Sequence, residues 1–395
     1  MMMMTLSPHR RPSYVCDTLK DLRAACLVCR AWRESALVPL YARVILHSPQ
    51  QLDLFLRSLE HYKALASLVR SIQLPDETQS LPEHLPAARP FGYQKRRLWD
   101  LGRAVGLVLE RCSTATEIAF RVNTPKLSFV HGYDSNAHRI QRLELSAGPR
   151  NDPTQILRET ALPILRLPTL PIADPLITHL TLYGLHVFPA HELIRFPRLV
   201  TLRIHFCVAA MGWLDRILDR CPVLEILQIE AFAYDTRQRW NLSELRPASN
   251  SLRQLRLDWS RRDLGQSLSF LQYLTLLELS VRTILDDPSP IDLPSNLETL
   301  IFSTRGFVFR GEYGGSRCAL ISAVGALQRR LPSWKRASTP NLVNLQLSGD
   351  GAVGHCILWD WAIASFLLQP FCRSLGVNLD IFLFIVSAPQ KRRGF

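Results

Sequence analysis

The sequence predicts an α/β fold in which short parallel strands alternate with helical connectors along the chain. A six-residue phrase with apolar residues at its positions 1, 4 and 6 recurs over residues 177–303. The copies read ITHLTL, LVTLRI, LEILQI, LRQLRL, LTLLEL and LETLIF, and they begin at Ile177, Leu199, Leu224, Leu252, Leu274 and Leu297. Successive copies are 22, 25, 28, 22 and 23 residues apart. Unrelated amphipathic strands would be spaced irregularly, so the nearly even steps favour a repeat.

Steps of about 20 to 29 residues are typical of leucine-rich repeats. Side chains alternate on a strand, so positions 4 and 6 point into the interior, whereas positions 3, 5 and 7 point out. One copy cannot bury its apolar side alone, and stacked neighbours share a continuous core. The predicted fold is therefore an α/β leucine-rich-repeat solenoid, a curved horseshoe with parallel strands on its concave face.

The phrase also occurs outside this regular region. Further strands are predicted at VRSIQL from Val69, ATEIAF from Ala115, IQRLEL from Ile140, LVNLQL from Leu342 and LDIFLFIV from Leu379. Helical spacing of apolar residues predicts helices over 51–68, 97–112, 191–196, 211–220, 316–331 and 358–375. The 45 residues between Leu297 and Leu342 suit two periods, one of them degenerate. Proline-rich stretches at 75–90 and 148–175 predict insertions between repeats.

The N-terminal segment has a different pattern. Residues 17–32, DTLKDLRAACLVCRAW, place apolar side chains near one face at helical spacing, which predicts a helix with a buried face. A second short apolar helix and a strand over 43–46 follow. The sequence LRAACLVCRAW and the later LYARVIL resemble the second half of an F-box and the first strand after it. In this order of segments the chain is similar to F-box/leucine-rich-repeat proteins of the fungal type.

The resemblance implies a function. In that family the F-box docks on the Skp1 adaptor of a cullin-RING ubiquitin ligase, and the repeats hold the substrate. It implies that the adaptor-binding residues include Leu22, Leu27, Val28, Cys29 and Trp32. The family opens with a Leu-Pro and an acidic first helix, whereas residues 1–13 read MMMMTLSPHRRPS, so the expected F-box is degenerate or truncated at its N-terminus. A ligase-independent leucine-rich-repeat scaffold is the alternative.

These observations predict the organisation of the chain. We expect a disordered N-terminus over 1–13, an F-box-like helical segment over 14–46, the solenoid over 47–386 and a frayed basic tail over 387–395.

Net charge and hydropathy limit the classes of partner that the chain is expected to bind. The 395 residues carry a net charge of +13, but the basic residues form scattered clusters, which serve solubility more often than groove binding. Nucleic-acid binding is therefore the less favoured alternative. The most apolar run, over 381–386, is shorter than the roughly 20 residues of a membrane span, and no cleavable signal is recognised. We expect a protein of the cytoplasm or nucleus with no membrane partner.

No enzymatic, metal or cofactor motif is convincing. Cys26 and Cys29 have C-x-x-C spacing, but zinc needs four ligands and no second pair stands nearby. Residues 349–354 read GDGAVG, a G-x-G-x-x-G that lacks the βαβ context of a dinucleotide site and predicts a glycine-rich turn. We therefore expect neither catalysis nor a cofactor.

The outward positions of the phrase are the candidate substrate-binding residues. They are Arg142, Glu144, His179, Thr181, Tyr183, Arg203, His205, Gln228, Glu230, Arg256, Asp258, Glu278 and Gln346. Three arginines stand among four acidic residues, so a polyanion would gain little on this face, because phosphate binding depends on several neutralised charges in a row. The mixed charges predict a protein partner instead.

Overall fold

A computed structural model describes residues 24, 27–74, 101–122, 139–147, 164–166, 176–188, 195–230, 232–234, 241–258, 267–281, 292–303, 316–352 and 355–386. The chain divides into two compact units, and each is described by itself. The N-terminal unit consists of the described residues of 11–224 and 232–240. The C-terminal unit consists of those of 225–231 and 241–395.

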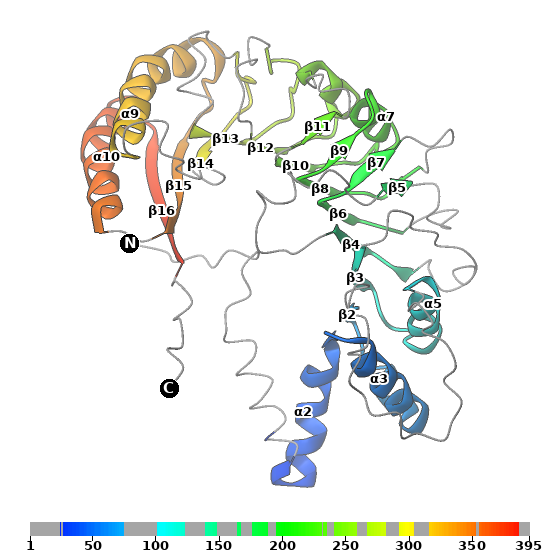
Figure 1. Cartoon of the computed structure of the whole chain (residues 1–395). Helices are drawn as coiled ribbons and strands as arrows, with labels where there is room; N and C mark the ends of the chain where they lie inside the picture. Colours follow the sequence, from blue (N-terminus) through cyan, green and yellow to red (C-terminus); the bar gives the residue numbers. More distant parts are fainter. Residues whose placement is uncertain are drawn as a thin grey trace. The chain divides into compact units, whose positions relative to one another are not determined.

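Two parallel sheets run through the N-terminal unit (Figure 1). The first has the strand order β1-β2-β3-β4-β6-β8, with strands β1 (Arg43–Ile45), β2 (Ser71–Gln73), β3 (Glu117–Val122), β4 (Arg142–Ala147), β6 (His179–Tyr183) and β8 (Thr201–His205). The second has the order β11-β9-β7-β5, with strands β5 (Ile164–Arg166), β7 (His186–Phe188), β9 (Val208–Ala209) and β11 (Ala233–Tyr234). The ladder starts at β1, one strand before the phrase at Val69. Part of the stretch expected as an insertion, 148–175, is the strand β5.

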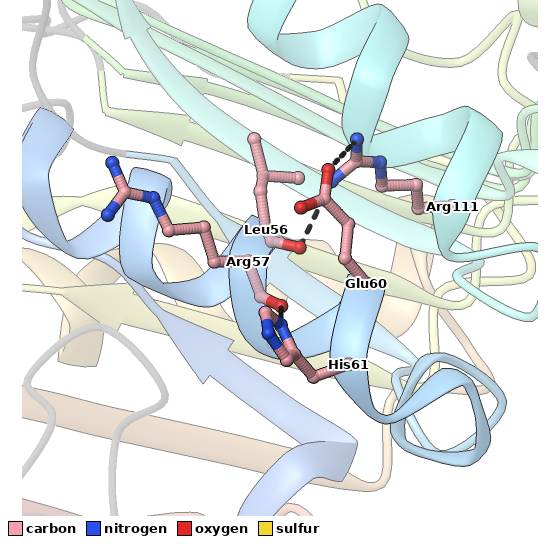
Figure 2. A network of polar contacts seen from close by, with 5 residues as sticks. All are labelled: Leu56, Arg57, Glu60, His61 and Arg111. Atoms are coloured by element: carbon pink, nitrogen blue, oxygen red, sulfur yellow. Dashed lines mark hydrogen bonds and ion pairs between the residues drawn. The ribbon is translucent and has the colours of Figure 1, made fainter. Parts of the chain in front are cut away.

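Helix α2 (Arg30–Ala42) precedes the first strand. The helices between strands are α3 (Pro49–His61), α4 (Lys63–Ala66), α5 (Leu101–Arg111) and α7 (Trp213–Asp219). Helix α3 starts at a side-chain cap, because the Ser48 hydroxyl accepts a hydrogen bond from the Gln51 amide (3.3 Å). Arg111, the last residue of α5, holds α3 in place (Figure 2). Its guanidinium donates to the Leu56 carbonyl (3.0 Å) and to the Glu60 carboxylate (2.6 Å).

The C-terminal unit contains one parallel ladder and its connecting helices (Figure 1). The strand order is β10-β12-β13-β14-β15-β16, with strands β10 (Ile226–Glu230), β12 (Gln254–Asp258), β13 (Leu276–Ser280), β14 (Thr299–Ser303), β15 (Asn344–Ala352) and β16 (Asn378–Val386). The helices are the 3-10 helix η3 (Leu242–Ala248), α9 (Ser316–Ser333), the π-helical turn η4 (Trp334–Ser338) and α10 (His355–Ser374). Helix α10 packs against both α9 and β16.

The predicted phrase matches the observed core. Leu224 and Leu227, at positions 1 and 4 of one copy, are fully buried, and Ile229 at position 6 is nearly so. A turn precedes the phrase: the amide of Leu224 donates to the carbonyl of Cys221 (3.2 Å), and Cys221 is itself buried. The same turn recurs before Leu199, Leu274, Leu297 and Leu342. These five copies therefore bury a fourth position, one more than the phrase suggested.

Adjacent strands are joined at their starts by a repeated pair of hydrogen bonds. The amides of Val200 and Thr201 both donate to the carbonyl of Thr178 (2.9 Å each). In the C-terminal unit, the amides of Val343 and Asn344 donate in the same way to the carbonyl of Glu298 (2.9 and 3.0 Å). The second example spans the 45-residue connector, yet its geometry matches that of a 22-residue step.

Three sequence predictions need correction or fall outside the described residues. Strand β14 pairs directly with β15, so the 45-residue interval is one long repeat whose helix α9 replaces the expected degenerate copy. Strand β15 continues through Gly349 and Gly351, which are therefore strand residues rather than a turn. The helix predicted over 191–196 lies almost wholly outside the described residues. None of the described helices is long and apolar enough to cross a membrane.

Candidate protein-binding surfaces

The outward positions of the N-terminal ladder lie side by side because the parallel strands are in register. Glu117, Arg142 and His179 are register neighbours on β3, β4 and β6. The Arg142 guanidinium and the Glu117 carboxylate form an ion pair (3.3 Å) that is largely exposed. In the next row, Glu144, Thr181 and Arg203 are aligned on β4, β6 and β8. This part of the strand face therefore interleaves cations with carboxylates.

His179 reports the electrostatic character of this face. Its pKa is lowered from the ordinary value, first by burial and then by the positive charges of Arg142 and Arg203, with Glu117 opposing them. Its Nδ1 atom and the Thr178 hydroxyl form a hydrogen bond of 2.8 Å. Burial and the two arginines together therefore favour the neutral imidazole.

Aromatic rings gather where β6 and β8 end. The Tyr183 and His205 ring centroids are 6.2 Å apart. The Phe206 ring meets Tyr183 edge-on, with centroids 5.4 Å apart and planes at 61°. Tyr183 and Phe206 are half-buried, but His205 is only 4% exposed. The sequence prediction that His205 presents its side chain to a partner is therefore wrong, since the ring lies below the surface.

The strand face of the C-terminal unit is more acidic. Arg256 and Glu278, in register on β12 and β13, form an ion pair of 3.2 Å, with side chains 18% and 14% exposed. Glu230 and Asp258 are register neighbours on β10 and β12. Gln228, expected on the surface, is in fact 7% exposed, and its amide nitrogen has no hydrogen-bond partner among the described residues. Acidic positions thus outnumber the single arginine in these two rows.

A hydrogen-bonded ladder of amides extends across the same face. The Asn378 side chain donates to the Asn344 side chain (3.3 Å), which donates in turn to the Thr299 hydroxyl (3.4 Å). Gln346, half-buried on β15, lies in the neighbouring row, in register with Ile301 on β14 and Asp380 on β16. This part of the face therefore combines amide side chains with the exposed carboxylate of Asp380.

Helix α2 forms a separate surface in the N-terminal unit. Leu27 and Val28, just before it, are 87% and 62% exposed, and Trp32 in its first turn is 58% exposed. Cys29, its N-cap residue, is also exposed, whereas Leu22 lies outside the described residues. The predicted buried face is therefore exposed over these residues.

The four buried thiols of the described residues are chemically inert. Burial raises the pKa values of Cys112, Cys207 and Cys221 to about 12 and that of Cys372 to about 11, so these thiols stay protonated and unreactive. Cys26 of the C-x-x-C pair lies outside the described residues. Within the described ranges, no three His, Cys, Asp or Glu side chains are grouped so that they could hold a metal ion.

Sequence reasoning missed Phe206. It follows position 7 of its copy, as Gly184 does in the preceding copy, and both have positive φ, 52° and 67°. A comparison of the eighth positions would have revealed a large aromatic residue where the preceding copy has glycine. The six-residue phrase ends before the eighth position and therefore does not include this difference.

Comparison with known families agrees with this architecture. Residues 134–287 match the family described as FBD-associated F-box protein At5g56370, LRR repeats. The match spans less than half of the chain. No curated protein matches the sequence. The buried phrase, the parallel ladders and this match define an α/β leucine-rich-repeat solenoid, similar in its central repeats to an F-box-associated family, and they support a role in protein interaction.

Proposed function

We propose that this protein is the substrate-recognition subunit of a Skp1–cullin–F-box ubiquitin ligase in the cytoplasm or nucleus. In this proposal the segment from Leu27 through α2 binds a Skp1-type adaptor, and the strand faces bind a protein substrate. Such a subunit brings its substrate to the ligase and needs no catalytic residue of its own.

The exposed apolar side chains at α2 carry the proposal. Leu27 and Trp32 are 87% and 58% exposed, although both residue types are normally buried. They belong to the sequence that resembles an F-box. Apolar and aromatic side chains that are exposed together mark protein interaction sites. A buried tryptophan anchor typically contributes 2 kcal/mol or more, in order of magnitude, to a protein interface.

A pull-down with a purified Skp1-type adaptor tests the proposal. The intact chain should retain the adaptor, whereas Trp32→Ala and Leu27→Asp should each weaken binding by about tenfold or more. Leu54→Ala is the matched control, because Leu54 is equally exposed (62%) but lies on α3, outside the F-box resemblance. Both variants should melt like the wild type, since the replaced side chains support no core. Failure of the intact chain to bind any adaptor would refute the ligase assignment.

The ligase-independent scaffold is the second candidate, and the family match favours it because that match covers repeats over residues 134–287 and not the F-box-like segment. It predicts no adaptor binding but retained capture of a protein partner by the strand faces. A double change, Tyr183→Ala with Arg203→Glu, should abolish that capture under either function while the melting temperature stays nearly constant. Capture at the wild-type level would move the partner site away from this face.

A further inference from the structure

Helix α10 carries apolar side chains on two faces. Leu368 and Cys372 are fully buried on the face that packs against α9 and β16. On the other face, Ile363 and Leu367 are each 41% exposed and Phe366 is 78% exposed. Their spacing of three and four residues places these three side chains next to one another on the helix surface. Helices of globular proteins normally leave the face opposite the core polar, so a second, exposed apolar face marks a binding surface.

Helix α10 lies beside α9 (Figure 1). The side-chain amide of Gln328 on α9 donates a hydrogen bond to the backbone carbonyl of Leu367 (3.2 Å), which holds the C-terminal half of α9 next to this part of α10. The next residue of α9, Arg329, is exposed. Its guanidinium turns back along α9, because Nη1 lies 3.6 Å from the position that a Cβ atom on Gly325 would occupy. A cation of α9 and the apolar side chains of α10 therefore share one surface.

Positive charge dominates these elements. Helix α9 and the turn η4 contain five arginine and lysine residues and no aspartate or glutamate. Arg329, Arg336 on η4 and Arg373 on α10 are exposed, and none of the three forms an ion pair with a described carboxylate. Arg373 follows Phe366 by about two helical turns and so lies on the same face of α10. Arginines in the last turns of helices also stabilise the helix dipole, but that role does not require the apolar face beside them.

Few carboxylates accompany these arginines. Asp360 is the one acidic residue in the sequence of α10, and its side chain lies outside the described residues. Glu298, just before β14, and Asp380 on β16 are exposed, and neither forms an ion pair with a described arginine. Among the described side chains, the surface therefore combines cations that are not neutralised with exposed apolar groups.

We infer that the α9–α10 surface, which consists of Arg329, Ile363, Phe366, Leu367 and Arg373, binds an acidic amphipathic helix of a partner protein. The inference goes beyond the proposed function, in which the adaptor binds α2 and the substrate binds the strand faces. Apolar side chains of the incoming helix pack against Phe366 and its neighbours. Carboxylates that flank its apolar face pair with the two arginines.

Other occupants fit this surface less well. A second copy of the chain would bring arginines against the same arginines, because identical patches meet in a two-fold dimer. A nucleic acid would neutralise the arginines but leave Phe366 exposed to water. A membrane would gain little from an apolar face of about one helical turn, since stable anchoring needs a larger apolar area or a second anchor.

Synthetic peptides test the inference without a known partner. The acidic peptide has leucine at positions i, i+3, i+4 and i+7, with glutamate and alanine between them. A second peptide has lysine in place of glutamate, and a third has the acidic composition in scrambled order. Each is fluorescently labelled and titrated with the full chain at one salt concentration, and anisotropy is measured. The acidic amphipathic peptide should bind about tenfold more tightly than the other two. No binding of this peptide, or equal binding of the scrambled one, overturns the inference.

Variants locate the peptide on the surface. Phe366→Ala and Arg329→Glu should each weaken binding of the acidic peptide by about tenfold. A double variant, Arg329→Glu with Arg373→Glu, should prefer the lysine peptide, because the charge of the surface is reversed. An unchanged preference overturns the inference. Binding of oligo(dT) or of phosphatidylserine vesicles that is tighter than peptide binding, and that the same variants weaken, would assign the surface to a nucleic acid or a membrane instead.

Two controls separate the site from general surface effects. Met211→Ala removes an apolar side chain that is 61% exposed in the N-terminal unit, and Arg253→Glu reverses an arginine whose side chain is 60% exposed in the C-terminal unit. Both should bind the acidic peptide like the wild type. Equal weakening by the controls would mean that the peptide binds nonspecifically, and it would also overturn the inference.

Thermal melting separates a binding residue from a structural one. Phe366→Ala should melt like the wild type because the ring is 78% exposed, whereas Leu368→Ala should melt lower because Leu368 is fully buried. A fall in Phe366→Ala as large as that in Leu368→Ala would assign the ring to the core and overturn the inference. Adaptor capture depends on Trp32 in another element, so loss of peptide binding with retained adaptor capture leaves the ligase proposal standing.

Discussion

Replacement of Leu227 tests the repeat frame most directly. Its side chain is fully buried at position 4 of β10, and its register partner Leu255 on β12 is fully buried as well. Truncation to alanine removes about three methylene-sized groups, worth about 2.4 kcal/mol of transfer free energy at about 0.8 kcal/mol each. The strand ladder resists collapse, so a cavity remains and raises the expected cost to about 3 to 4 kcal/mol. Leu227→Asp would place an unpaired carboxylate in this interior and should prevent folding of the unit.

Urea and thermal unfolding followed by circular dichroism measure this cost. For a unit of this size, about 3 to 4 kcal/mol corresponds to a fall in melting temperature of about 6 to 15 °C. Val343→Ala is the control in the same unit, because Val343 is 45% exposed at position 2 of its phrase, and it should cost less than about 0.5 kcal/mol. An unchanged midpoint in Leu227→Ala, or an equal effect of the control, would show that position 4 does not form the core.

Three further predictions concern charged groups and thiols. Because the pKa of His179 is lowered in the folded chain, the unfolded chain binds more protons below about pH 6.5, so stability should fall as the pH falls through this value. His179→Gln should flatten that dependence in urea titrations between about pH 7.5 and pH 5, and an unchanged slope would contradict the assignment. Iodoacetamide at about pH 8, followed by peptide mass spectrometry, should modify exposed Cys29 quickly and buried Cys207 only after denaturation, since the pKa of Cys207 is raised to about 12. A double-mutant cycle on Arg256 and Glu278 should give a coupling energy of about 1 to 2 kcal/mol, above that of the more exposed ion pair between Arg142 and Glu117. Equal coupling energies would mean that burial does not strengthen the ion pair.

The strand ladders could be predicted from the sequence because one buried pattern recurs. Positions such as Leu202 and Leu277 are fully buried, and each follows from strand alternation alone. The connecting helices α5, α7, α9 and α10 were also predicted, with ends shifted by a few residues. The spacing of apolar residues indicates that a helix is present more reliably than it indicates the first and last residues of that helix.

The remaining features depend on contacts that no local pattern encodes. Direct pairing of β14 with β15 depends on where the long connector folds, and the spacing alone suggested an extra strand. Burial of His205 and Gln228 reflects neighbouring strands and rings, whereas alternation predicted only the direction of their side chains. The helical pattern around Trp32 could not indicate its exposure, because an apolar helical face looks the same whether it packs inside the chain or against a partner. Only the F-box resemblance pointed to a partner there.

The paired hydrogen bonds at the strand starts align neighbouring strands independently of the number of residues between those strands. The carbonyl of Thr178 accepts two amide hydrogen bonds from the start of the next strand, which follows after a 22-residue step. The carbonyl of Glu298 accepts the same pair of hydrogen bonds from a strand that follows after 45 residues. Alignment is thus set where one strand meets the next, whatever the length of the chain between them. A reporter domain inserted into the connector between β14 and β15 should therefore leave the leucine alignment intact, which makes that connector a natural place for engineered fusions and for inherited insertions.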